Sequence, residues 1–524
     1  MELPHHLLHL PFEGDRPHER RQQGLLVVCA AMFISAVDMT IVNVALPDIA
    51  EELDAGVGEL QWVIDAFLVA LAGLLLMGSG LADRFGRKRI FLSGMAAFAV
   101  SSVLCALAPS AVALIGARAL MGVAAACVLP PALSLVAVMF PPEERPKALG
   151  VWAAVAGIGL VIGPVLGGVL VREVGWEAVF LVNVPVAVLV VPAGMRVLPE
   201  STRPGTPPID LPGVALSIVS LGCIVFALIE GPDAGWSSPH VIATGAVGVL
   251  AGALFVRTEL QRRQPLFDVR VLARPAVAAG ALAILSVYIA FLGTMFLLPQ
   301  YLQYVQDRSP VAAGLVLGPL GIGGAIGARY NARVFAALGP RLTVAGGIVA
   351  LAAAIGPLLL LGRNTTVAVV LLSTALIGAL IALSVPPATA VIMNDLGEDK
   401  AGDGGAVNQL ARQVGGALGV AIVGTVFAAV YGNRIADARG FSAGQRERAE
   451  GSIEEARDAL AEVAGPLRDQ LVARVDDAYD VAARAGFGVC MAVLLLAAAV
   501  AAFALAPRRL VTKIQVEPGS DAGV

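Results

Sequence analysis

Long apolar stretches recur along almost the whole chain, and they constrain its fold more strongly than any other feature. About fourteen of them run for roughly 18–25 residues, each long enough to cross a bilayer core of about 30 Å. We expect spans near residues 25–47, 59–81, 90–108, 111–139, 148–170, 178–198, 211–230, 239–256, 275–299, 311–335, 342–362, 367–391, 404–431 and 484–506. Because lipid cannot hydrogen-bond to a backbone, such spans are helices, and the sequence predicts an all-α integral membrane protein.

Composition supports lipid as the solvent and excludes several classes of function. Hydrophobic residues make up 57% of the chain and charged residues 15%, whereas a soluble domain carries roughly 25% charged residues. A net charge of −4 gives no basic surface for nucleic acid. The five cysteines all fall inside apolar stretches without framework spacing, so neither disulfides nor a metal site is expected.

The charges between the spans indicate which face is cytoplasmic. Basic residues follow the second, fourth, eighth and last spans, at Arg84, Arg87, Lys88, Arg89, Arg145, Lys147, Arg257, Arg262, Arg263, Arg270, Arg274, Arg508, Arg509 and Lys513. They share a face with the arginine-bearing N-terminal tail, and the positive-inside rule makes this face cytoplasmic. We therefore expect both termini in the cytoplasm, and the high Ala, Gly and Arg content favours a bacterial plasma membrane.

Segment 432–483 is an exception, since it carries many arginines and still falls on the outer face. A loop this long is translocated largely regardless of its charge. Within it, apolar residues recur every three or four positions, at Leu460, Val463, Leu467, Leu471 and Val475. This spacing predicts an amphipathic helix that lies on the outer surface.

The connections leave no room for a soluble catalytic domain. An ATP-binding loop needs a Gly-Lys pair, and none of the four lysines follows a glycine. No nucleophile–base pair or metal cluster falls at membrane depth. We therefore expect no enzymatic activity and no cofactor, and an ion gradient would have to drive any uphill transport.

Three charged residues lie inside the spans. Asp38 lies about 20 Å along the first span, and Asp65 and Arg118 lie about six and seven residues into the second and fourth spans from outside. A charge at such depth costs about 2.5–3.5 kcal/mol on insertion scales, so it marks a cavity, a partner or a function. Because burial and a nearby guanidinium both change a carboxylate's proton affinity, we predict that these three residues couple transport to protons. A purely structural Asp–Arg pair is the alternative.

The loop after the second span carries a compact motif. Residues 80–89 run Gly-Leu-Ala-Asp-Arg-Phe-Gly-Arg-Lys-Arg. A cytoplasmic anchor of positive charge would explain the basic residues alone. The spacing adds a glycine turn, and an aspartate that could pair with a neighbouring helix N-terminus in one conformation only. Gly80, Asp83, Arg84, Gly86 and Arg87 would then form a latch, which suits a protein with two conformations.

The fifth span contains a strip of small residues. Gly159, Gly163 and Gly167 recur every four positions, Gly168 follows, and Pro164 interrupts the strip. Small residues at this spacing let helices approach closely, and a proline favours a kink. The proline favours a specific interface over generic packing.

Polar and aromatic residues in other spans are candidates for a substrate path. They are Asn43, Trp62, Phe67, Tyr288, Gln300, Gln303, Asn408 and Arg412. The polar clusters that end the ninth span and open the thirteenth could equally anchor helices at the membrane interface. Phe67, Trp152, Tyr288 and Phe291 could line a cavity, or face lipid or a neighbouring helix.

Four segments resemble motifs of the major facilitator superfamily, in particular its fourteen-spanner drug–proton antiporter branch. Residues 38–47 are similar to that branch's first-helix motif, and residues 80–89 to the superfamily's loop motif. Residues 118–122 resemble the fourth-helix arginine motif, and residues 157–168 the antiporter motif. Met121, Glu177-Ala178 and the missing aspartate near Gly339 depart from the family pattern.

The resemblance implies a major-facilitator fold, with two six-helix bundles plus two additional helices around a midplane cavity that opens alternately to each side. The chain would then comprise a cytoplasmic tail, an N-terminal bundle, a linker with the two extra helices, a C-terminal bundle and a second cytoplasmic tail, at residues 1–24, 25–198, 199–274, 275–506 and 507–524. Asp38 and Arg118 match the family's proton-coupling positions, and Asp83 and Arg87 match its gate.

We therefore expect a monomeric, proton-coupled antiporter that exports small lipophilic or amphipathic molecules such as drugs and antibiotics. Its partners would be the solute, protons and the lipid bilayer, without ATP, nucleic acid or a cofactor. Two alternatives stay open. One is a proton-coupled symporter or facilitator for a metabolite on the same fold, and the other is a membrane receptor or sensor that binds a ligand without transporting it.

Overall fold

The computed structural model describes residues 18–505, apart from 142–143, 203–209, 263–267, 364, 398–399 and scattered positions between 437 and 465. Every regular element in these residues is a helix, which confirms the all-α prediction. The first half contains α1 (His18–Leu53), α2 (Val57–Phe85), α3 (Arg87–Ala106), α4 (Ala111–Ala126), α5 (Leu129–Met139), α6 (Arg145–Glu173), α7 (Ala178–Leu181), α8 (Asn183–Val197), α9 (Leu211–Ala234) and α10 (Pro239–Gln261). The second half contains η3 (Val269–Ala273), α11 (Pro275–Tyr304), α12 (Pro310–Leu317), α13 (Pro319–Arg341), η4 (Leu342–Gly346), α14 (Gly347–Ile355), η5 (Gly356–Leu360), α15 (Val367–Leu396), α16 (Ala401–Ala436) and α19 (Pro466–Ala504).

The described residues contain thirteen helical stretches long and apolar enough to span a membrane, against the fourteen predicted. The difference lies in one continuous run, Pro310–Leu360, whose 51 residues count once. At 1.5 Å per residue this run would be about 77 Å long, more than twice the bilayer core. It is non-helical at Gly339, where φ is +71°, and both α13 and α14 pack on α15. A straight rod could not do this, so the chain reverses within the run.

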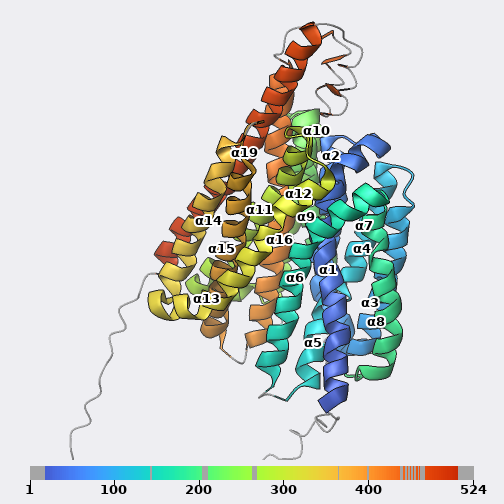
Figure 1. Cartoon of the computed structure of the whole chain (residues 1–524). Helices are drawn as coiled ribbons and strands as arrows, with labels where there is room; N and C mark the ends of the chain where they lie inside the picture. The colour runs from blue at the N-terminus through green and yellow to red at the C-terminus, as the bar shows by residue number, and fades with distance from the viewer. Residues whose placement is uncertain are drawn as a thin grey trace, which may run out of the picture.

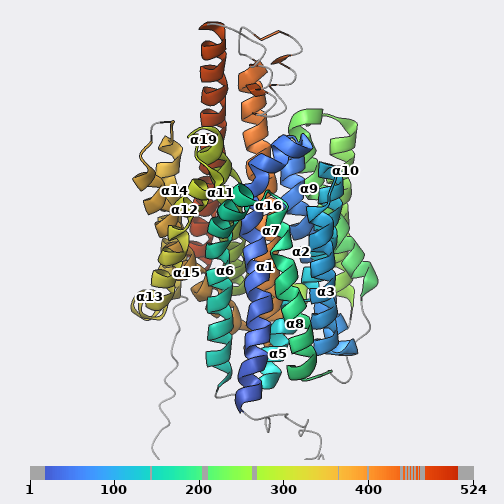
Figure 2. The same ribbon diagram turned by 45° about the vertical axis from the view of Figure 1, so that its right-hand side comes forward.

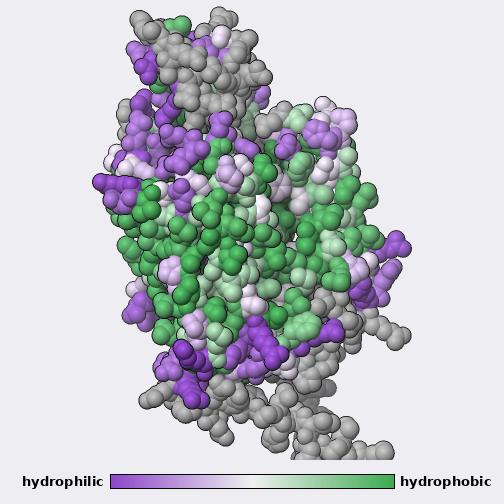
Figure 3. Space-filling view, turned by 90° about the vertical axis from the view of Figure 1, so that its right-hand side faces the viewer, coloured by the Kyte–Doolittle hydropathy of each residue, from purple (hydrophilic) through white to green (hydrophobic). Residues whose placement is uncertain are grey.

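The helices form two bundles side by side (Figures 1 and 2). In the first, α1 packs on α6 and α2 on α4; in the second, α11 packs on α16 and α19, and α13 on α15. The extra helices α9 and α10 pack on each other, and α9 contacts both α2 and α16, so it bridges the bundles. On the face seen in Figure 3, a band of apolar side chains lies between two polar ends, as expected for a protein that crosses a bilayer.

The described residues include only a small part of the two predicted tails. Residues 18–24 of the predicted N-terminal tail belong to α1, because hydropathy marks only the apolar part of a helix. Residues 1–17 and the predicted C-terminal tail, 507–524, lie outside the described residues. α1 begins and α19 ends toward the same face (Figure 1). We call this the N-terminal face; α2 ends there and α16 begins there.

The predicted surface helix in segment 432–483 is wrong as a separate element. Residues from Pro466 onward belong to α19, which continues into the last span. α16 and α19 project together beyond the rest of the bundle, at the end opposite the N-terminal face (Figure 2). Leu471 and Val475 are each only 1% exposed, because this part of the apolar stripe packs inside the protein, whereas Leu467 at the start of α19 is 45% exposed. Val463 lies outside the described residues.

Ion pairs hold the linker around α9 and α10 at the N-terminal face. Asp210 caps α9 by accepting a hydrogen bond from the Gly213 amide at 2.8 Å, and pairs with Arg262 at 2.5 Å. Asp268 pairs with Lys400 across the gap to the start of α16, at 2.9 Å. The hydrogen bond from Lys400 lowers the pKa of Asp268, so this pair persists to a lower pH than an ordinary aspartate would allow.

The glycine strip of α6 packs directly on α1. A Cβ added at Gly163 would lie 2.1 Å from the Thr40 hydroxyl oxygen, and one at Gly159 would lie 2.7 Å from the Phe33 carbonyl oxygen. Pro164 has no N–H, so the carbonyl of Leu160 loses its helical partner. The Thr40 hydroxyl donates to that carbonyl at 3.1 Å. The close α1–α6 contact therefore also supplies the hydrogen-bond donor that Pro164 cannot provide.

We expect Thr40→Val to destabilise this interface by about 1–3 kcal/mol, because it leaves the Leu160 carbonyl buried without a donor while keeping the side-chain shape. Thermal unfolding of the purified protein measures the effect. Thr40→Ser keeps the hydroxyl and is the matched control. Equal melting temperatures for the valine and serine variants would contradict the role assigned to this hydrogen bond.

Candidate transport site

A cavity of about 520 Å³ lies between the two bundles, within the usual size range for small-molecule sites. Its walls come from α1, α2, α4, α5, α6, α11, α15 and α16. Lining residues include Ser79 near the end of α2, Met393 near the end of α15 and Gly405 near the start of α16. Since these three helix ends lie at the N-terminal face, the cavity opens there.

Contacts between the bundles close the opposite side. Gln303 of α11 donates to the Val44 carbonyl of α1 at 3.0 Å. A Cβ added at Gly168 of α6 would lie 2.4 Å from the Pro310 carbonyl oxygen at the start of α12. The structure is therefore one state of a protein whose bundles are joined on one side and separated on the other, as alternating access requires.

The cavity wall is mainly apolar and aromatic. Phe67, Trp152, Tyr288 and Phe291 all line it, although the sequence left open whether they face lipid. Arg412 also lines it, with its guanidinium carbon 4.9 Å from the centre of the Tyr288 ring. The predicted path residue Asn408 lines the same wall and donates to the Thr389 hydroxyl.

Asp38 and Arg118 form a buried ion pair beside this cavity. The Arg118 Nη1 donates to Asp38 Oδ2 at 2.8 Å, and both side chains are at most 2% exposed. Arg118 Nε donates to the Val63 carbonyl at 2.9 Å. The second carboxylate oxygen accepts a bond from Asn183 at 3.3 Å, and Asn183 also donates to Ser102 at 2.8 Å. The pair is thus held by hydrogen bonds to two other helices, α2 and α8, and Ser102 of α3 holds Asn183 in place.

The Phe67 ring forms a wall between the ion pair and the cavity. Phe67 lines the cavity, and the Arg118 guanidinium carbon lies 4.5 Å from its ring centre. Ser35 and Met39, which flank Asp38 by three residues and one residue, also line the cavity. A solute in the cavity would therefore touch the Phe67 ring, which contacts Arg118, and residues of α1 on either side of Asp38.

Asp65, the third predicted coupling residue, does not join this pair. It is fully buried, and neither of its carboxylate oxygens has a hydrogen-bond partner among the described residues. Gln61, one turn earlier, lies against Gly424, and Leu68 lies near Gly416. This face of α2 is therefore turned to α16. The structure brings two of the three predicted coupling residues together and places Asp65 at a contact between the bundles.

The loop of residues 80–89 forms a tight connection between α2 and α3. Gly86 adopts φ +112°, which favours glycine. Asp83 accepts two hydrogen bonds from Arg87, at 2.8 and 3.0 Å. We expected Asp83 to pair with a neighbouring helix N-terminus, but in this state it pairs with Arg87. Glu200, which follows α8, lies at the N-terminus of α3 and accepts a bond from the Lys88 amide at 3.1 Å.

The other gate residues make weaker contacts. Gly80 has open space around its Cα, and Arg84 lies over the Phe85 ring at 5.6 Å. The sequence analysis did not predict two residues of these sites: Glu200, which bonds to the start of α3, and Asn183, which bonds to Asp38. Each carried a detectable signal: an acidic residue next to a basic loop face, and an amide inside an apolar span.

Four predicted path residues lie away from the large cavity in this state. Asn43 donates to carbonyls of its own helix, and the Trp62 ring lies 6.2 Å from the Phe226 ring of α9, tilted by 49°. Gln303 joins the two bundles, as described above. Gln300 donates to the Phe296 carbonyl at 2.6 Å and lines a second, much smaller cavity.

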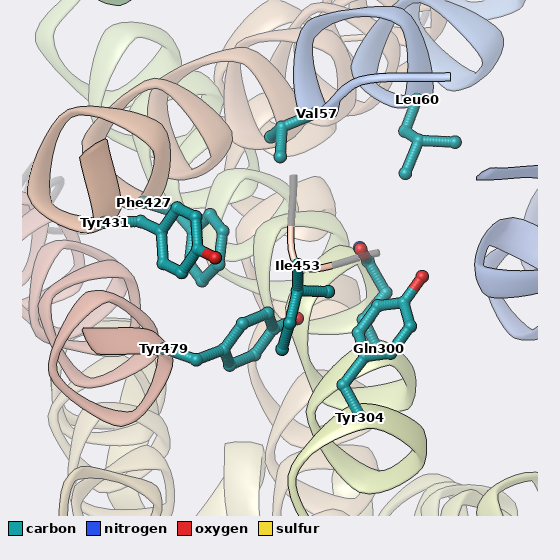
Figure 4. A pocket seen from close by; sticks show the side chains of 8 residues that line it. All are labelled: Val57, Leu60, Gln300, Tyr304, Phe427, Tyr431, Ile453 and Tyr479. Carbon is teal, nitrogen blue, oxygen red and sulfur yellow. The ribbon is translucent and has the colours of Figure 1, made fainter. Parts of the chain in front are cut away.

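That second cavity lies on the closed side and has a volume of about 10 Å³, room for about one water molecule. Its lining side chains are Val57, Leu60, Gln300, Tyr304, Phe427, Tyr431, Ile453 and Tyr479 (Figure 4). The rings of Phe427 and Tyr479 meet edge to face, with centres 4.8 Å apart. Aromatic packing thus closes the side opposite the N-terminal face.

Comparison with known proteins fits this geometry. The family model for the Major Facilitator Superfamily matches residues 28–420. The chain belongs to the major facilitator superfamily. It is therefore a multi-pass membrane transporter rather than an enzyme, and the resemblance inferred from its motifs is confirmed. The described residues hold no group of three or more His, Cys, Asp or Glu side chains placed to bind a metal ion.

Similar members of the superfamily are named for resistance and export. The chain is 33% identical over 510 residues to the tetracenomycin C resistance and export protein of Streptomyces glaucescens, covering 95% of this chain and 94% of that protein. It is 38% identical to the puromycin resistance protein pur8 of Streptomyces alboniger, covering 80% and 84%. It is 33% identical to the multidrug efflux pump LfrA of Mycolicibacterium smegmatis, covering 92% and 96%.

Solved structures show the same fold. A bacterial homologue of the human lysosomal transporter Spinster, in an inward-facing and unoccupied conformation, superposes with a TM-score of 0.65 at 19% identity, covering 93% of this chain and 98% of that one. At this identity the likeness concerns the fold alone.

Proposed function

We propose that this protein is a proton-coupled antiporter that exports small amphipathic or lipophilic molecules, such as drugs or antibiotics. The observation that carries the proposal is the Phe67 ring, which is shared by the cavity wall and the buried Asp38–Arg118 pair. Solute transport can be coupled to protonation of a carboxylate only if a structural element contacts both sites. The names of the three relatives support export of drug-like molecules.

In this mechanism the state described here receives the solute, with the N-terminal face in the cytoplasm as the positive-inside rule predicts. A proton from outside binds Asp38 and removes its negative charge. The charge-assisted bond from Arg118 then weakens, so the guanidinium and the Phe67 ring against it can shift. The bundles part on the outer side, and the solute leaves.

A proton gradient can drive this cycle without ATP or a cofactor. Each elementary charge that crosses 100 mV releases about 2.3 kcal/mol. A driving force near 150 mV would thus supply roughly 3–4 kcal/mol, equivalent to a few hundred-fold in concentration. We propose that the protein works as a monomer in a bacterial plasma membrane, with both termini in the cytoplasm.

Everted membrane vesicles test the proposal, because the cytoplasmic face is then outside. We expect an acid interior to drive accumulation of aromatic dyes by the intact protein, and nigericin, which collapses the pH gradient, to stop it. Vesicles without the protein are the control. Accumulation that ignores the pH gradient would exclude proton coupling, and binding without accumulation would favour a receptor.

A further inference from the structure

Arg412 makes the wall of the large cavity positively charged. Of the described residues that line it, Arg412 alone carries a formal charge, and none of them is Asp or Glu. Within the part of the chain that the structure describes, the only interaction found for the Arg412 guanidinium is with the Tyr288 ring. A guanidinium in an apolar wall without a carboxylate partner attracts an anion.

Two further polar atoms in the same wall have no partner among the described residues. The Trp152 indole N–H and the Gln413 side-chain oxygen are both buried without a hydrogen bond, and both residues line the cavity. Buried polar groups are normally hydrogen-bonded, so an unpartnered pair in a cavity wall marks a place where a solute or water binds. Gln413 is 3% exposed and adjoins Arg412 in the chain.

The shape of the solute follows from the remaining wall. Phe67, Tyr288 and Phe291 present rings to the cavity, with Tyr288 and Phe291 edge to face at 6.2 Å. Aromatic rings at such spacing favour flat aromatic partners. The nearest carboxylate of the coupling machinery, Asp38, is neutralised by Arg118 and lies behind the Phe67 ring.

We infer that the cavity takes an aromatic anion, such as a carboxylate, sulfonate or phenolate, and that its negative group pairs with the Arg412 guanidinium. This inference rests on the proposed function and narrows its substrate class. Trp152 donates a hydrogen bond to the same solute. An inside-negative membrane potential favours export of an anion and opposes export of a cation, so exchange of a monoanion for an entering proton moves two charges in the favourable direction.

Three aromatic fluorescent dyes of different charge separate the possibilities in everted vesicles. Anilinonaphthalene sulfonate is anionic, N-phenylnaphthylamine is its neutral parent, and rhodamine 6G is cationic. We expect the intact protein to accumulate the sulfonate at least tenfold faster than rhodamine 6G. Removing the membrane potential with valinomycin and potassium should slow the sulfonate more than the neutral parent.

Variants of the arginine identify the residue responsible. Arg412→Gln should remove at least nine-tenths of sulfonate accumulation and spare the neutral parent, whereas Arg412→Lys should retain part of it. Arg333→Gln is the matched control, because Arg333 also lies over a tyrosine ring, that of Tyr330 at 6.0 Å, but lies outside the cavity lining.

Each other outcome has a definite meaning. Rhodamine 6G accumulation that equals or exceeds that of the sulfonate, or a sulfonate rate unchanged in Arg412→Gln, would overturn the anion assignment and leave the exporter in place. Gradient-driven movement of the neutral parent alone would do the same. If none of the three dyes responds to the pH gradient, both the anion assignment and the proposed antiport fail.

Discussion

Asp38→Asn should reduce gradient-driven accumulation by at least about 100-fold, the usual scale of loss when a positioned proton carrier is removed. The amide has almost the shape of the carboxylate but cannot take up a proton at physiological pH. Solute exchange without a gradient should persist, because the cavity wall is unchanged. Uptake and exchange in everted vesicles measure the two activities separately. Glu51→Gln, an exposed acid on the same helix, is the control.

The alternative to coupling is a structural role for the Asp38–Arg118 pair, and a second variant separates the two. Removing one partner of a buried pair leaves the other charge uncompensated, at a cost of about 3–5 kcal/mol. Asp38→Asn should therefore also lower thermal stability. Adding Arg118→Gln removes the uncompensated charge and should restore much of that stability. If the double variant regains gradient-driven transport as well, Asp38 is structural and the proposed coupling role fails.

The depth of Asp38, Asp65 and Arg118 in the membrane could be predicted from the sequence, but the side of the helix on which each lies could not. Counting residues along a span gives depth directly, at 1.5 Å per residue. Which face a residue occupies is normally shown by an apolar stripe, and a helix that is apolar all round has none. Asp65 lies only two residues from Val63, whose carbonyl contacts Arg118, yet it is turned to α16 instead.

The same limit explains why the residues that line the cavity could not be predicted from the sequence. Aromatic side chains that face lipid and those that face an internal cavity look alike in sequence, so Trp152 and Phe291 could not be assigned before the helices were placed. The motif-bearing segments were more informative, because their residue types have few other uses. Gly159, Gly163 and Gly167 predicted a close helix contact, and the structure supplies its partner, α1.

Gly168 lies in the same strip but faces α12 of the other bundle, so its substitution should have a different consequence. A Cβ there would lie 2.4 Å from the Pro310 carbonyl oxygen, and backbone atoms cannot rotate away. Overpacking of this kind costs about 1–3 kcal/mol. In Gly168→Ala this cost falls on the state that is closed on the outer side, which shifts the equilibrium toward the outward-open state by on the order of 5–150-fold. Net export should fall by a similar factor.

Thiol labelling from the outside reports the shift directly. Gln300 is 5% exposed at the small closed cavity, so a cysteine at this position should react slowly with an impermeant maleimide. In a Gly168→Ala background the labelling should accelerate by roughly the same 5–150-fold. Gly157→Ala is the matched control on the same helix, since a Cβ there meets nothing within 4 Å. Unchanged labelling in Gly168→Ala would mean that the α6–α12 contact does not hold the outer side closed, and closure would then depend on the aromatic packing around Tyr479 instead.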